Sequence, residues 1–205
     1  IVTGTIWKFG ELTLAQGVSF LVSLVLARIL MPEDYGVVSI ILIFISVANV
    51  FLSSGLNTAL IQKRDPTELE FNTVFFFFLI LGFVVYIFFY IFAPTLADFY
   101  NMPLLKPTIR VLAIRLPISA FQSIQSAYVS KKMDFKKFFF ASIVGTVISA
   151  VLGIVMAYKG FGVWSLISQY LSNTIVNTFM LFLIVKWRPQ FQFSFSAVKP
   201  LIRYG

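Results

Sequence analysis

Long uncharged runs constrain this chain more than any other feature of its sequence. Residues 35–62, 71–97 and 160–185 contain no Asp, Glu, Lys or Arg. A helix needs about 20 mostly apolar residues to cross roughly 30 Å of hydrocarbon, so each run is long enough to span a bilayer. The composition agrees, because 59% of the residues are hydrophobic and only 12% are charged, too few to cover a water-soluble fold. The sequence therefore predicts an all-α integral membrane protein.

Charges and prolines divide the chain into six predicted helices. They cover residues 5–30, 35–62, 71–97, 107–131, 137–159 and 162–186. Together they form a six-helix lobe over residues 1–189. Residues 190–205 are predicted to be a linker along the membrane interface, although Phe alternates in it with Gln or Ser as in a strand. Ser196 suits the N-cap of a further helix, and we expect the chain to be a fragment of a longer protein.

The positive charges predict an orientation. Eleven Lys and Arg residues fall in alternate loops on one side, which holds both chain ends, and four fall on the other side. Because cytoplasmic loops carry the excess of Lys and Arg, both ends of this segment are predicted to be cytoplasmic. We interpret the net charge of +8 in the same way, and not as a nucleic-acid surface.

Four of the predicted helices carry a stripe of polar residues along one face, at about 100° per residue. The stripes include Gln16 in the first helix, Asn49 and Asn57 in the second, Gln122 in the fourth, and Gln169, Asn173 and Asn177 in the sixth. Polar groups in hydrocarbon are costly unless they are satisfied. They can line a hydrophilic cavity or hydrogen-bond between packed helices. Four aligned stripes favour the cavity.

The third and fifth helices have no such stripe. The third is rich in Phe all round and is predicted to face lipid. The fifth carries Ser142, Gly145, Ser149 and Gly153 at three- and four-residue spacing. Small residues at this spacing indicate close helix packing.

Three charged residues lie on the polar stripes of the predicted helices. Lys8 and Glu11 are three apart and can pair. The pair either anchors the first helix at the interface or acts as a switchable carboxylate or ion-pair gate. Arg115 lies about two turns into its helix on the polar stripe, whereas Arg110 points away from that stripe. Arg115 faces an anionic ligand or a carboxylate, or else snorkels to the membrane surface.

Catalysis finds little support in the residue types. The chain has no Cys and no His, which removes thiolate and imidazole chemistry, and its acidic residues form no Asp-x-Asp pair to hold a metal. We therefore predict no enzyme activity, no catalytic residue, no metal site and no bound cofactor.

Several stretches resemble the Wzx-type oligosaccharide flippases of the MATE/MOP exporter superfamily, in particular the colanic-acid and teichuronic-acid exporter branch. They are residues 4–8 (GTIWK), 26–36 (LARILMPEDYG), 55–62 (GLNTALIQ), 97–100 (ADFY) and 160–164 (GFGVW). The resemblance runs along essentially the whole chain, and the second stretch is its most specific part. It implies that this chain is the first of two six-helix lobes around a central cavity.

The resemblance also implies a function. Such proteins move an undecaprenyl-diphosphate-linked oligosaccharide across the bacterial cytoplasmic membrane by alternating access, for export of surface polysaccharide or for lipopolysaccharide synthesis. Expected partners are this lipid-linked substrate, membrane lipid, a polysaccharide polymerase and a chain-length protein, with no nucleic acid. Coupling to a proton or sodium gradient is compatible with the resemblance.

By this resemblance, Lys8 and Arg115 are candidates to meet the diphosphate or acidic sugars, with Glu11 beside them. The amides of Gln16, Asn49, Asn57, Gln122, Gln169, Asn173 and Asn177 are candidates for sugar hydroxyls. Two alternatives stay open: a cation-coupled multidrug exporter of the same fold, and a non-transporting scaffold for envelope assembly. A cationic drug would call for an acidic cavity, whereas here only Glu11 is an acid within a predicted helix.

Overall fold

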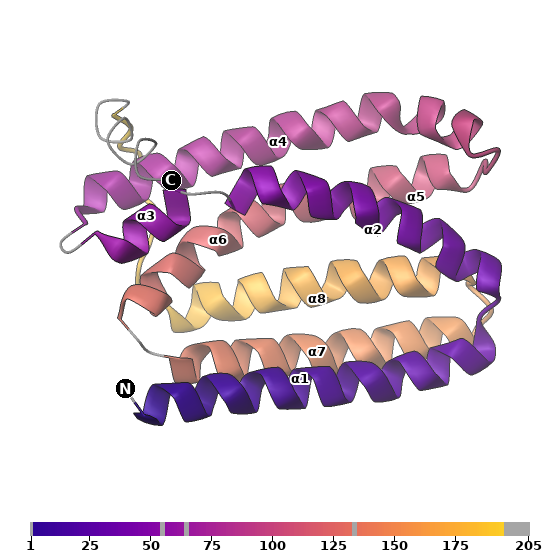
Figure 1. Cartoon of the computed structure of the whole chain (residues 1–205), viewed down its shortest axis with the longest axis horizontal. Helices are drawn as coiled ribbons and strands as arrows, with labels where there is room; N and C mark the ends of the chain where they lie inside the picture. The colour runs from indigo at the N-terminus through magenta and orange to yellow at the C-terminus, as the bar shows by residue number, and fades with distance from the viewer. Residues whose placement is uncertain (1, 54–55, 64–65, 133–134, 195–205) are drawn as a thin grey trace.

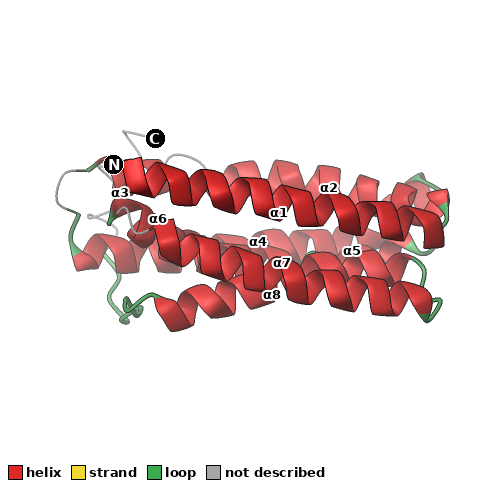
Figure 2. Cartoon of the chain, turned by 90° about the horizontal axis from the view of Figure 1, so that it is seen from below, coloured by secondary structure: helices red, strands yellow, loops and turns green. Residues whose placement is uncertain are grey.

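The computed structural model describes residues 2–53, 56–63, 66–132 and 135–194, which form helices lying along one common axis (Figure 1). The helices are α1 (Val2–Ile29), α2 (Pro32–Ser53), α3 (Leu56–Gln62), α4 (Glu68–Phe99), α5 (Leu105–Leu112), α6 (Arg115–Lys131), α7 (Phe135–Tyr158) and α8 (Val163–Ile184). Helices joined by loops make up this part of the chain (Figure 2). The predicted all-α class is confirmed.

Five of these helices are long and apolar enough to cross a membrane. The qualifying stretches are Leu12–Ile29, Pro32–Val50, Glu68–Phe99, Lys136–Tyr158 and Val163–Ile184. The start of α1 and the ends of α3, α6 and α8 lie at one end of the bundle (Figure 1). We call it the basic end, because Lys63, Lys131, Lys132 and Lys186 lie there. The turns from α1 to α2, α4 to α5 and α7 to α8 lie at the opposite end.

The predicted helix over residues 107–131 is wrong in one respect, because the structure breaks it. Helix α5 ends at Leu112 and α6 begins at Arg115, and both pack against α4. Pro117 explains the break: it has no N–H to give the carbonyl of Ala113, and its ring would clash with that carbonyl in a regular helix. The Ala113 carbonyl accepts instead from the N–H of Leu116 at 2.9 Å, three residues on.

The predicted helix over residues 35–62 also becomes two described helices, α2 and α3, and residues 54–55 between them are outside the description. Helix α2 begins at Pro32, where a missing N–H costs no helical hydrogen bond. Glu33 and Asp34 in its first turn stabilise α2, because their negative charges lie at the positive end of the helix dipole. Toward its other end α2 contacts α6, and Asn49 lies on that side of the helix.

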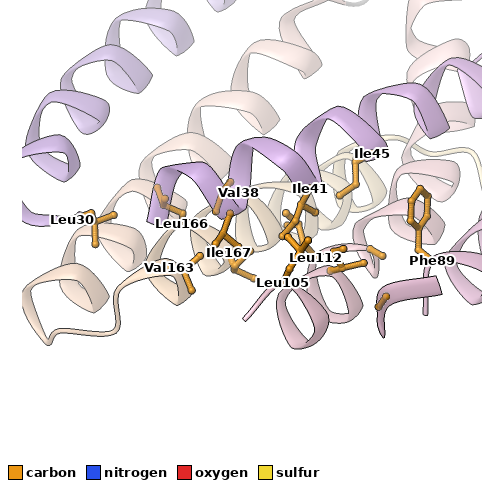
Figure 3. Close-up of a cluster of buried hydrophobic side chains, with 14 of the residues drawn as sticks. Leu30, Val38, Ile41, Ile45, Phe89, Leu105, Leu112, Val163, Leu166 and Ile167 are labelled. Atoms are coloured by element: carbon orange, nitrogen blue, oxygen red, sulfur yellow. The ribbon is translucent and has the colours of Figure 1, made fainter. Parts of the chain in front are cut away.

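Two clusters of buried apolar side chains hold the lobe together. One joins α1, α2, the second half of α4, α5, α7 and the first half of α8, and ten of its side chains are labelled in Figure 3. The other, toward the basic end, joins α3, the first half of α4, α6, α7 and the end of α8. The prediction that residues 71–97 simply face lipid is therefore only half right. Phe75, Phe78 and Phe89 are buried in these clusters, while Phe83 and Phe88 are exposed.

Small residues bring α7 and α8 together, as the spacing in residues 142–153 predicts. A Cβ added to Gly153 would lie 3.0 Å from the Cβ of Gln169, and one added to Gly145 would lie 3.3 Å from the Cβ of Asn177. These contacts are tighter than ordinary packing, so glycine is what lets the two helices approach.

Gly153→Ala should therefore destabilise the lobe by about 1–3 kcal/mol, the usual cost of overpacking a tight contact. Gly17→Ala is the matched control, because a Cβ there meets nothing within 4 Å. Because alanine favours helix more than glycine does, Gly17→Ala should stabilise the folded protein by about 0.5–1 kcal/mol. Thermal unfolding of the full-length protein in detergent, followed by circular dichroism, measures both. Equal stability of the two variants would contradict the packing described here.

Candidate functional site: a polar cavity between α2, α3 and α6

Helix α6 forms one wall of a cavity of about 330 Å³, and α2 and α3 form the facing wall. The lining is hydroxyl- and amide-rich. It consists of Asn49, Asn57, Ile61, Ser119, Ala120, Gln122, Ser123, Ser126, Ala127 and Ser130. The α6 residues recur every three or four positions, so they share one helical face, and from Ser119 to Ser130 this face extends for roughly 16 Å. None of the lining residues carries a charge.

Asn57 joins the two walls of the cavity. Its Nδ2 donates a hydrogen bond to Oγ of Ser123 across the gap between α3 and α6. Its Oδ1 is buried and has no hydrogen-bond partner among the described residues. A buried amide oxygen without a partner is costly, and a bound hydroxyl or water would satisfy it. On the α6 side, Oε1 of Gln122 accepts a bond from Oγ1 of Thr178 on α8 at 3.4 Å.

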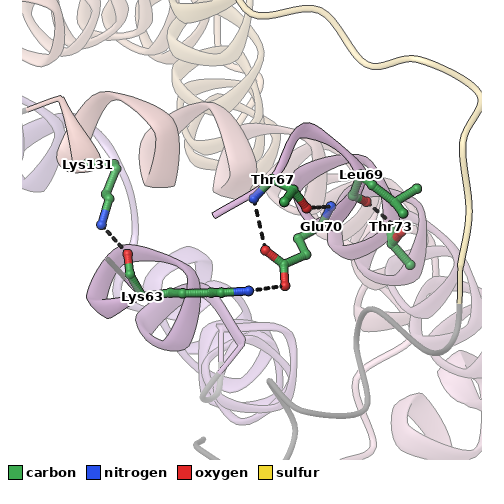
Figure 4. A network of polar contacts seen from close by, with 6 residues as sticks. All are labelled: Lys63, Thr67, Leu69, Glu70, Thr73 and Lys131. Carbon is green, nitrogen blue, oxygen red and sulfur yellow. Dashed lines mark hydrogen bonds and ion pairs between the residues drawn. The ribbon is translucent and has the colours of Figure 1, made fainter. Parts of the chain in front are cut away.

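The position of α3 depends on two lysines at the basic end (Figure 4). Nζ of Lys131, at the end of α6, donates to the carbonyl of Ile61 at 3.0 Å and to that of Lys63. Lys63 in turn pairs with Glu70 of α4 at 2.5 Å. Glu70 also closes a capping box with Thr67, which fixes the start of α4. The short α3 wall is thus tied to both α6 and α4.

Three of the predicted candidates, Asn49, Asn57 and Gln122, lie together in this cavity. The three amides of α8 lie elsewhere. Nδ2 of Asn173 donates to Ser149 of α7 at 3.3 Å, and Gln169 and Asn177 pack against the glycines of α7. The polar stripe of α8 therefore serves helix packing. The sequence pattern instead favours a cavity for all four stripes.

The remaining candidates lie outside the cavity lining. Gln16 is exposed on α1. Lys8 and Glu11 belong to α1, but their side chains are outside what the structure describes, so their pairing stays a prediction.

Arg115 is the first residue of α6, one turn beyond Ser119, whose hydroxyl donates to the Arg115 carbonyl at 2.8 Å. Its guanidinium carbon lies 5.9 Å from the ring centroid of Tyr170 on α8. Its Nε is buried and has no hydrogen-bond partner in the described part of the chain. Arg110 differs, because it stacks on Tyr90 at 4.2 Å and donates to the Tyr90 carbonyl. The two arginines thus have different surroundings, one on each side of the break between α5 and α6.

Sequence reasoning missed two sets of polar residues. Ser123 pairs with Asn57 but lies beside the predicted stripe. Glu70, Asn72, Thr73 and Gln125 are buried toward the basic end. The capping pattern from Thr67 to Glu70 is the sequence signal for Glu70, Asn72 and Thr73. It shows that α4 begins before the apolar run, so that these residues belong to the helix.

A second cavity, of about 490 Å³, lies between α2 and α4. Its lining is apolar: Ile43, Phe44, Val47, Ala48, Val85, Phe88, Phe89, Phe92 and Leu96. It provides no polar side chain, so the cavity on α6 is the candidate for polar ligands.

These features define a multi-pass membrane protein with a polar cavity inside its helical bundle. The chain belongs to the family described as polysaccharide biosynthesis protein, which matches residues 25–205. It is 26% identical to the succinoglycan biosynthesis transport protein ExoT of Rhizobium meliloti, over 97% of this chain and 40% of that protein. It is 24% identical to the lipopolysaccharide biosynthesis protein WzxC of Escherichia coli, over 100% of this chain and 42% of that protein.

The teichuronic acid biosynthesis protein TuaB of Bacillus subtilis is 26% identical over 77% of this chain and 33% of that protein. The chain thus spans about two fifths or less of the length of these relatives. No solved structure matches it. The predicted family is confirmed.

If the cavity on α6 holds water, a cysteine in it should react with a hydrophilic thiol reagent. The chain has no cysteine of its own, so single substitutions can be compared directly once any other cysteines of the full-length protein are replaced. Ser126→Cys should react at least about tenfold faster than Ser149→Cys, because a thiolate must form in contact with water to react. Ser149 is the matched control, since it is 2% exposed between packed helices. Equal rates would show that the cavity is closed to water.

Proposed function

We propose that this chain is one lobe of an exporter that moves a lipid-linked oligosaccharide across the bacterial cytoplasmic membrane by alternating access. The proposal is supported by the family and by the printed name of ExoT, a biosynthesis transport protein. The undecaprenyl-diphosphate carrier and any polymerase or chain-length partner belong to the same proposal. The basic end of the bundle would face the cytoplasm, because positive charge is retained on that side.

The observation that carries the proposal is the uncharged, hydroxyl- and amide-lined cavity. A saccharide presents many hydroxyls, each of which donates and accepts hydrogen bonds. Amide and hydroxyl side chains can match both roles, whereas an apolar bundle would leave the sugar unsolvated. The unpartnered Oδ1 of Asn57 is an acceptor for such a hydroxyl.

Arg115 supplies a cation at one end of this polar face. A guanidinium binds phosphate oxygens through charge-assisted hydrogen bonds. The buried Nε–H of Arg115 has no partner among the described residues and can donate such a bond. We assign Arg115 to the diphosphate or to an acidic sugar. Coupling to a proton or sodium gradient, with Glu11 as its carboxylate, belongs to the same proposal, and no catalytic step is assigned.

The cavity lining also favours oligosaccharide export over multidrug export by a protein of the same fold. A cationic drug is best held by a carboxylate, and none of the residues lining the cavity is acidic. A saccharide needs no carboxylate.

Asn57→Leu should reduce export about fivefold, since a lost hydrogen bond to a neutral group is worth about 1 kcal/mol. The assay expresses the full-length protein in cells lacking their own exporter and measures surface polysaccharide together with lipid-linked units inside. Thr58→Val is the matched control, because Thr58 is exposed on α3 and does not line the cavity. Unchanged export by Asn57→Leu would remove the cavity from the transport path.

Arg115→Gln should reduce export in the same assay roughly tenfold or more, as expected for a hydrogen bond to a charged group. Lipid-linked units should accumulate as surface polysaccharide falls. Arg110→Gln is the control, an arginine of the neighbouring helix whose contacts are with Tyr90. A drug exporter would tolerate Arg115→Gln and lose function on Glu11→Gln. A scaffold would keep its function when Lys8 and Arg115 are both neutralised.

A further inference from the structure

The ten residues that follow α8, 185–194, form neither helix nor strand, yet they are held against the first turns of α4. We call this segment the strap. In Figure 1 it leaves the end of α8 at the basic end and rises past α6 toward α4.

Trp187 is the main apolar anchor of the strap. It is 4% exposed, and its ring lies 5.9 Å from that of Phe75, 6.2 Å from that of Phe71 and 6.3 Å from that of Tyr128. Its indole N–H donates to Glu68 at 2.8 Å, which satisfies the polar edge of the ring. Trp187 thereby becomes part of the core at the basic end.

The strap backbone is bound by side chains of the lobe. The N–H of Gln190 donates to Oδ1 of Asn72 at 2.9 Å, and the N–H of Ser194 donates to Oγ1 of Thr73 at 3.2 Å. The carbonyl of Trp187 accepts from Nε2 of Gln125 at 3.4 Å.

The side chains that bind the strap are polar yet buried, with Asn72 and Thr73 near the start of α4 and Gln125 in the middle of α6. Asn72 is 1% exposed, and Thr73 and Gln125 are 0% exposed. Burying an amide or a hydroxyl is costly unless it finds a partner. Nδ2 of Asn72 has no partner in the described part of the chain, so its bond to the strap is what offsets its burial. The ring of Phe191 adds a stack on Phe76, with centroids 5.4 Å apart.

We propose that the strap is a fixed part of this lobe, clamped by Asn72, Thr73, Gln125 and Glu68. The rigid body therefore extends at least to Ser194, ten residues beyond the end of α8 at Ile184. A linker between two moving parts would be free from the last helical residue onward, whereas this segment moves with α4 and α6. The inference rests on contacts within the lobe and does not depend on the proposed transport function.

The test is a distance measurement between spin labels in the full-length protein, with other cysteines replaced. Labels at Ile87→Cys on the exposed side of α4 and at Gln192→Cys on the strap report whether the strap moves relative to α4. Thr73 and Ile87 are separated by roughly 21 Å of helix, a distance that pulsed electron paramagnetic resonance measures well. We expect one narrow distance distribution in the labelled parent.

Asn72→Leu with Thr73→Val keeps side-chain size while removing both acceptors, and should at least double the width of this distribution. Thr95→Val, at the far end of α4, is the matched control and should leave it narrow. A broad distribution in the parent, or a narrow one in the double variant, would overturn the proposal.

Hydrogen exchange keeps the proposal testable if the double variant does not fold. The amides of Gln190 and Ser194 in the full-length parent should exchange at least tenfold more slowly than the amide of Gln192, whose partner among the described residues is the nearby Gln190 carbonyl. Equally fast exchange of all three amides would also overturn it.

Discussion

Every polar group inside this bundle needs a hydrogen-bond partner, because hydrocarbon offers none, and helix α6 supplies several of these partners. Its Ser123 bonds to Asn57, its Gln122 to Thr178 and its Gln125 to the strap. At its end Lys131 caps the carbonyls of α3. Helix α6 contacts α2, α3, α4, α7 and α8, so the positions of these helices are linked through it.

The position of α6 is set in turn by a proline and a glycine. Pro117 breaks the helix after α5 and starts α6 at Arg115. Gly82 of α4 lets the two helices meet at this break, because a Cβ there would lie 3.1 Å from the Cα of Pro117. The break places Arg115 at the end of the polar face of α6, with its guanidinium toward Tyr170.

The sequence predicts the class and the helices because both depend on local composition. It cannot distinguish two polar stripes of the same period. The stripe of α6 lines a cavity, whereas Asn173 of α8 bonds to Ser149 of α7. A helical wheel says which residues share a face but does not say what lies opposite that face. The small residues of α7 were the available clue, since close packing there had to meet some neighbouring face.

The other differences between the predicted and the observed structure have separate causes. Pro117 is a visible signal for the break between α5 and α6, because a proline inside a helical stretch breaks or kinks the helix. The strap was not predictable, because its anchors Asn72 and Thr73 precede it by more than a hundred residues. The alternation of Phe with Gln and Ser over residues 190–196 indicates an extended segment but not its docking surface. Ser196, the predicted N-cap, lies outside the described residues.

The cavity and the strap meet on the same helix, and this bears on how the lobe can move. Gln122 and Gln125 are three residues apart on α6, one lining the cavity and the other holding the Trp187 carbonyl. Packed helices shift as rigid bodies more readily than they deform, because well-packed interiors resist small strains. A displacement of the strap would therefore act on α6 and, through α6, on Asn57 and the cavity wall. If the strap is fixed as proposed, the polar cavity keeps its shape while the lobe moves as a unit. Changes in access to the cavity then come from what lies against its open side.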